Sequence, residues 1–165
     1  MGYRATSTNS RSFYLAQAAE LRGEVNIIKN VPATPESVVQ NINDYVNYYR
    51  IRINPERSGE TEATIKFDFG GDKVYGLEIS RAVVNYLDNS VASKTKADVT
   101  VQMKPEVWAE IYNNTAAFDD LLKAEKITVT QGDSATASQL MGLFDPIYDW
   151  QNDKGLQDLS KMMSQ

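Results

Sequence analysis

The chain has 165 residues, 42% of them hydrophobic, and a formal net charge of −5 at pH 7. This size fits one domain, or one domain with an appended helical segment. It contains no histidine and no cysteine, which excludes imidazole or thiolate metal sites, Ser-His-Asp triads and a disulfide scaffold. The acidic balance without clustered basic residues argues against a nucleic-acid partner, and the apolar runs are too short for a transmembrane segment.

The first predicted element is a helix that follows the polar cluster at residues 7–10. Apolar side chains recur at helical spacing from Phe13 to Leu21, and Gly23 is a suitable end. Residues 25–32 are expected to be extended. Because this helix has no apolar partner nearby in the sequence, we expect residues 1–32 to be a linker helix and extended segment left from an upstream region.

The central part of the chain predicts a helix followed by strands. Thr34 and Pro35 mark the start of a helix that is expected to end near Asn47. The periodicity then changes to two, which predicts strands over residues 49–54, 61–69, 73–80 and 97–103. Residues 81–88 suit another strand, although a helix also fits their pattern. Gly70-Gly71-Asp72 predicts a tight hairpin turn, and the short connections favour an antiparallel meander.

The remainder is predicted to be mainly helical. Helices are expected at residues 105–112, at residues 118–122, and from the cap Asp133 to a stop at Pro146, with a brief strand at residues 127–129. The fold class is therefore α+β, an antiparallel-dominated sheet of about five strands covered on one face by helices. We expect one domain over residues 33–150 and a polar tail over residues 151–165.

A set of apolar and aromatic side chains forms the candidate binding site. Such residues most often fill a core, but a subset of them can line a tunnel. Burial gains roughly 0.8 kcal/mol per methylene, so a twelve-carbon chain would gain about 9 kcal/mol before association costs. The candidate ligand-binding residues are Phe67, Phe69, Tyr75, Leu77, Trp108, Ile111, Tyr112, Phe118, Leu140, Met141 and Phe144.

The charged residues give weaker indications of function than the apolar set. Arg50 and Arg52 lie on one face of a predicted strand, where they would either receive an anionic head group or form a solvated face paired with acids. Asp119 and Asp120 are adjacent on a predicted helix and so diverge in direction. No pair of carboxylates is expected to converge in a pocket, and we predict no catalytic residue in this chain.

The order of three segments, "ATIKFDFGGDKVYGLEIS", "ADVTVQMKPEVWAEIY" and "ITVTQGDSATASQLMGLFD", resembles the sterol carrier protein type two (SCP-2-like) fold. The segment "GYRATSTNSRSFYLAQAAELRG" resembles the linker helix that precedes this domain in bacterial zinc-dependent alkyl sulfatases of the metallo-β-lactamase superfamily. The resemblance covers roughly residues 2–150. In that family a catalytic domain and a helical dimerisation domain come before the SCP-2-like domain.

The resemblance implies an accessory domain that captures the apolar tail of a long-chain alkyl sulfate, fatty acid or similar amphiphile. The catalysis would belong to an upstream zinc domain that this chain does not contain, so no cofactor is expected in the chain itself. The resemblance also implies a homodimer of the full enzyme and a periplasmic or secreted location. Two alternatives stay open: a structural, dimer-supporting module with a filled core, and a freestanding lipid carrier.

Overall fold

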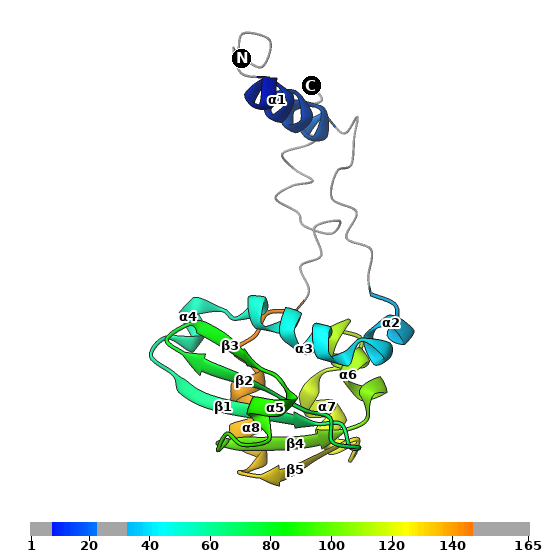
Figure 1. Cartoon of the computed structure of the whole chain (residues 1–165), viewed down its shortest axis with the longest axis vertical. Helices are drawn as coiled ribbons and strands as arrows, with labels where there is room; N and C mark the ends of the chain where they lie inside the picture. Colours follow the sequence, from blue (N-terminus) through cyan, green and yellow to red (C-terminus); the bar gives the residue numbers. More distant parts are fainter. Residues whose placement is uncertain (1–7, 23–32, 147–165) are drawn as a thin grey trace. The chain divides into compact units, whose positions relative to one another are not determined.

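The computed structural model describes residues 8–22 and 33–146. Residues 8–22 contain helix α1 (Thr8–Leu21), which confirms the helix predicted there. Residues 33–146 form a separate unit of one five-stranded sheet and short helices (Figure 1). The predictions of an extended segment at residues 25–32 and a polar tail at residues 151–165 fall outside the described residues.

Two short helices occupy the place of the single helix predicted before the sheet. Helix α2 (Pro35–Gln40) begins after Thr34, whose Oγ1 accepts a hydrogen bond of 3.2 Å from the Ser37 amide. Helix α3 (Ile42–Tyr49) follows directly after Asn41. The φ of −118° and ψ of 42° at Asn41 interrupt the regular helix between the two.

Residues 49–54 were predicted to be a strand, and this prediction is wrong. The chain forms the 3-10 turn η2 (Arg50–Arg52) and then helix α4 (Pro55–Ser58). The guanidinium of Arg52 lies 5.0 Å from the ring centre of Tyr49, three residues earlier. Residues three apart are neighbours on a helical turn, whereas in a strand they point to opposite faces. Ile51 is 79% exposed, so it does not lie on a buried strand face.

The sheet has the strand order β3-β2-β1-β4-β5. Strands β1 (Glu62–Asp68), β2 (Val74–Ser80) and β3 (Val83–Leu87) form the predicted antiparallel meander, and positive φ values at Gly70 and Gly71 make its first turn. Strand β4 (Val99–Met103) departs from that pattern because it pairs in parallel with β1, after the short helix α5 (Asn89–Ala92). Strand β5 (Ile127–Gln131) is antiparallel to β4.

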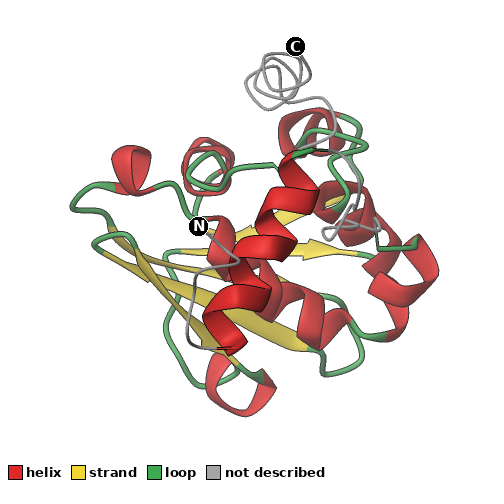
Figure 2. Cartoon of the chain, turned by 90° about the horizontal axis from the view of Figure 1, so that it is seen from above, coloured by secondary structure: helices red, strands yellow, loops and turns green. Residues whose placement is uncertain are grey.

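The core lies between one face of this sheet and the helices. Ile65 and Phe67 of β1 are fully buried, while the residues that alternate with them are more exposed. Figure 2 gives a view of this unit from above, with its strands in yellow and its helices in red. The helices that contribute buried side chains to this core are α2, α3, α6 (Pro105–Tyr112), α7 (Phe118–Lys123) and α8 (Ser134–Met141). This arrangement confirms the α+β class.

Candidate functional site

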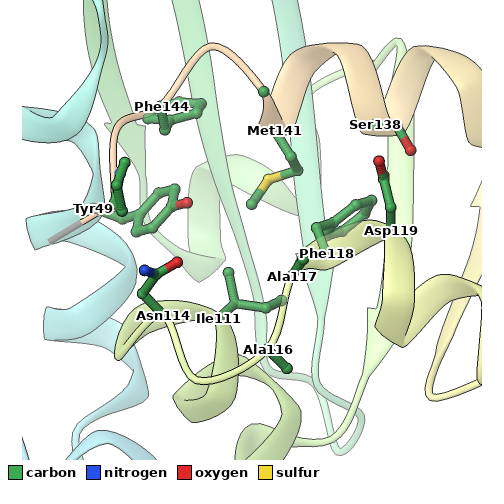
Figure 3. Close-up of a pocket in the computed structure, with 12 residues that line it drawn as sticks. Tyr49, Ile111, Asn114, Ala116, Ala117, Phe118, Asp119, Ser138, Met141 and Phe144 are labelled. Atoms are coloured by element: carbon green, nitrogen blue, oxygen red, sulfur yellow. The ribbon is translucent and has the colours of Figure 1, made fainter.

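A pocket of about 260 Å³ lies between the end of α3, the connection from α6 to α7, and the C-terminal part of α8 (Figure 3). Most of its lining is apolar or small. The apolar and small lining residues are Ile111, Ala116, Ala117, Phe118, Met141, Gly142, Phe144 and Pro146. The polar lining residues are Tyr49, Asn114, Asp119 and Ser138.

Tyr49 is the last residue of α3 and forms one wall of the pocket. The centre of its ring lies 5.1 Å from the ring centre of Trp108 and 5.0 Å from that of Phe144. The residue is 6% exposed. Burial raises the pKa of Tyr49 to about 12, an effect that the nearby Arg52 charge only partly opposes. Figure 3 shows the hydroxyl pointing into the pocket, and Tyr49 Oη has no hydrogen-bond partner among the described residues.

Arg52 holds this wall in place. Its Nη1 donates a hydrogen bond of 2.8 Å to the Tyr112 carbonyl at the end of α6, and its guanidinium lies 4.1 Å from the Tyr112 ring centre. The same guanidinium contacts Tyr49. Arg52 therefore positions aromatic rings rather than presenting a free cation, whereas Arg50 is exposed.

Phe144 is brought to the pocket by contacts with a distant part of the chain. It forms an antiparallel bridge with Ile53, and the Asp145 amide donates a hydrogen bond of 2.7 Å to the Arg52 carbonyl. The Asp145 carboxylate also accepts a hydrogen bond of 2.7 Å from Arg57 Nη2. These links fix the segment after α8 against the residues that follow α3, so both segments contribute walls to one pocket.

The connection from α6 to α7 forms the remaining wall. Asn114 has a φ of 55°, a left-handed conformation that asparagine tolerates, and it ends α6 where the sequence predicted. The Thr115 amide then donates a hydrogen bond of 2.9 Å to the Glu110 carbonyl. The chain consequently turns back, and α7 begins at Phe118, whose ring lines the pocket.

The structure divides the predicted site residues into two groups. Four of them line the pocket, namely Ile111, Phe118, Met141 and Phe144. The others are buried in the core and do not line it, namely Phe67, Phe69, Tyr75, Leu77, Trp108, Tyr112 and Leu140. Within this second group the ring centres of Phe67 and Trp108 are only 4.7 Å apart. A ligand-binding role for the whole set stays a prediction.

Sequence reasoning missed the polar members of the lining. Tyr49 carried a usable signal, since it continues the apolar spacing of α3 beyond Val46. Asn114 and Ser138 carried no such signal, because asparagine and serine are common at surface positions of helices and turns that have no binding role.

The charge of the pocket is negative. Among the described residues that line the pocket, Asp119 in the first turn of α7 is the one charged side chain. In residues 8–22 and 33–146 there is no cluster of three or more acidic, histidine or cysteine side chains able to hold a metal ion. None of the helices in those ranges has the length and apolar character needed to cross a membrane.

Comparison with known proteins agrees with this architecture. Residues 36–152 match the family model described as alkyl sulfatase C-terminal. Over 155 residues the chain is 26% identical to a linear primary-alkylsulfatase from a Pseudomonas species, an alignment that covers 92% of this chain and 23% of that protein.

Two solved structures share the fold. The stereoselective inverting sec-alkylsulfatase Pisa1 from Pseudomonas aligns with a TM-score of 0.63 and 20% identity, over 89% of this chain and 23% of that one. The palmitated SCP2L2 protein from Aedes aegypti aligns with a TM-score of 0.50 and 16% identity, over 66% of this chain and 98% of that one. The SCP-2-like fold is thus confirmed. The chain spans less than a quarter of the length of the alkylsulfatases it matches.

Proposed function

Since the chain belongs to the alkyl sulfatase C-terminal family, we propose that it is an accessory domain that binds the alkyl tail of amphiphilic substrates. The tail would be presented to a zinc catalytic domain in a longer enzyme, which would carry out the hydrolysis of the sulfate ester. The family's zinc ligands have no counterpart here, because the sequence has no histidine. A homodimer and a periplasmic or secreted location stay predictions from the resemblance.

The observation that carries this proposal is the pocket with apolar walls in an SCP-2-like fold. Ile111, Phe118 and Met141 offer hydrocarbon surface from three different elements around one space (Figure 3). Its volume of about 260 Å³ is just below the range of roughly 300–1,000 Å³ that is usual for small-molecule sites. The pocket therefore suits part of an alkyl chain, and the flexible Met141 side chain offers a way to enlarge it.

A structural module with a filled core is the competing function. The close packing of Trp108, Phe67 and Tyr49 favours it, because these rings leave no space for a ligand between them. The two functions differ in their response to chain length. Each methylene that enters the pocket should strengthen binding by about 0.8 kcal/mol, roughly fourfold in affinity, whereas a filled core should bind no tail in particular.

The test is a titration of the 165-residue chain with butyl, octyl and dodecyl sulfate below their micelle concentrations, followed by two-dimensional amide NMR. The expected result is saturable shifts near Ile111, Phe118 and Met141, with an affinity that rises with chain length. Equal responses to four and twelve carbons, or scattered shifts that do not saturate, would support the structural module instead.

A pair of variants on α8 locates the site. Ser138→Trp places a large ring in the pocket lining, and it should abolish the saturable shifts. Gln139→Trp is the matched control, because Gln139 is exposed on the same helix and does not line the pocket. If both variants bind dodecyl sulfate as the unmodified chain does, the tail does not occupy this pocket.

A further inference from the structure

The polar part of the pocket has an unusual composition for a site in contact with sulfate esters. Tyr49, Asn114 and Ser138 are neutral, and Asp119 is negative. No lysine or arginine lines the pocket within the described part of the chain. The neighbouring Arg52 is already engaged with the Tyr112 carbonyl and with two aromatic rings. A sulfate group in this space would approach a carboxylate without meeting a cation.

Tyr49 adds a second, independent observation. Its side chain is more than nine-tenths buried, and its hydroxyl points into the pocket without a hydrogen-bond partner among the described residues (Figure 3). The hydroxyl oxygen itself is not sealed in the core but borders the pocket, so its hydrogen-bonding capacity is open to an oxygen that enters there. A ligand oxygen in the pocket would accept a hydrogen bond from this hydroxyl. A neutral oxygen would do so without electrostatic repulsion from the Asp119 carboxylate.

We propose that the pocket selects a neutral, hydroxyl-bearing amphiphile, a long-chain alcohol, over the corresponding alkyl sulfate. The alcohol oxygen accepts a hydrogen bond from Tyr49 Oη, and the chain lies against Ile111, Phe118 and Met141. This inference rests on the proposed function, because it assigns the head-group preference of the same tail pocket. Hydrolysis of an alkyl sulfate with water gives an alcohol and hydrogen sulfate, so the pocket would hold the organic product of that reaction.

The expected selectivity follows from charge. An anion that leaves water without a compensating cation loses much of its solvation, whereas a neutral hydroxyl regains a hydrogen bond in the pocket. A sulfated chain can avoid the penalty by entering tail first and leaving its head in solvent, but it then makes no hydrogen bond with Tyr49. We expect 1-octanol to bind roughly tenfold or more tightly than octyl sulfate, which has the same carbon chain.

The decisive variants change single groups. Tyr49→Phe removes only the hydroxyl and should weaken 1-octanol binding by roughly 2- to 10-fold, the effect of one neutral hydrogen bond, without changing octyl sulfate binding. Tyr48→Phe is its control, since Tyr48 is 53% exposed and does not line the pocket. Asp119→Asn should strengthen octyl sulfate binding by roughly 2- to 5-fold, whereas Asp120→Asn, one residue further along α7, should not.

Dissociation constants of 1-octanol and octyl sulfate for the 165-residue chain and these four variants can be measured by amide NMR titration. Equal affinities for the two ligands, or equal losses in Tyr49→Phe and Tyr48→Phe, would overturn the preference for alcohols while leaving the tail pocket intact. Saturable binding of neither ligand would overturn the proposed function as well, so the two failures are distinguishable.

Discussion

Two glycines with left-handed backbones offer a sharp test of how α8 is positioned. Gly132, with a φ of 80°, joins β5 to the cap of α8, and Gly71, with a φ of 58°, lies in the β1–β2 turn. A Cβ atom on Gly132 would lie 2.5 Å from the Asp98 carbonyl oxygen and 3.0 Å from a methyl carbon of Val99. A Cβ atom on Gly71 would have nothing within 4 Å. Alanine at either site is therefore strained by the left-handed backbone, but only alanine at Gly132 also collides with neighbouring atoms.

The size of the difference can be worked out from these surroundings. Left-handed backbone costs an alanine about 1–2 kcal/mol, and the stiffer unfolded chain returns about 0.4–1 kcal/mol. Gly71→Ala should consequently lower the free energy of unfolding by about 1 kcal/mol. Gly132→Ala must in addition displace backbone of the segment that leads into β4, for which overpacking costs of about 1–3 kcal/mol are typical. We expect a total near 2–4 kcal/mol.

Urea unfolding of the two variants, followed by circular dichroism, measures this difference. With a urea dependence of about 1–3 kcal/mol per molar, an additional loss of about 2 kcal/mol lowers the midpoint of Gly132→Ala by roughly 1 M relative to Gly71→Ala. Equal midpoints would refute the reasoning, because they would mean that the segment at Asp98 yields to the new methyl group at no cost.

Two further predictions concern the wall of the pocket. Burial raises the pKa of Tyr49 to about 12 from the usual 10.0, so above pH 10 the native state keeps a proton that the unfolded chain loses. The free energy of unfolding should therefore fall between pH 10 and 12, by roughly 1.4 kcal/mol per pH unit from this group. Urea midpoints of Tyr49→Phe should decline less over that window, and parallel declines would contradict the assignment. Arg52→Lys should cost about 1–2 kcal/mol in urea unfolding, because lysine cannot both donate to the Tyr112 carbonyl and stack on two rings. Arg50→Lys, at an exposed position, should stay within about 0.5 kcal/mol of the unmodified chain, and similar losses in both would argue against a positioning role for Arg52.

Local patterns predicted most elements because their signals were consistent with one another. In β1, alternation, a following Gly-Gly turn and β-branched residues all indicate a strand, and residues 62–68 form one. At residues 49–54 the alternation extends over only a few positions, which a helical turn satisfies as well. There Tyr49 and Arg52 decide the outcome through contacts with Trp108 and Tyr112 from α6, which no local pattern contains. The parallel pairing of β4 with β1 is likewise set by a long crossover.

The candidate site was harder to predict than the fold for a related physical reason. Periodicity identifies the side chains that face inward, and large apolar residues are the strongest such signal. Large residues, however, are also the ones that fill space, as Phe67 and Trp108 do. Space stays open where small residues lie among larger ones, namely at Ala116, Ala117 and Gly142. The shape of the pocket also depends on contacts between segments that are distant in the sequence. Ala117 and Gly142 are exposed, so the pocket opens at the edge of the core, and a search for small residues beside aromatic ones would have pointed to it more directly than a search for the aromatic residues alone.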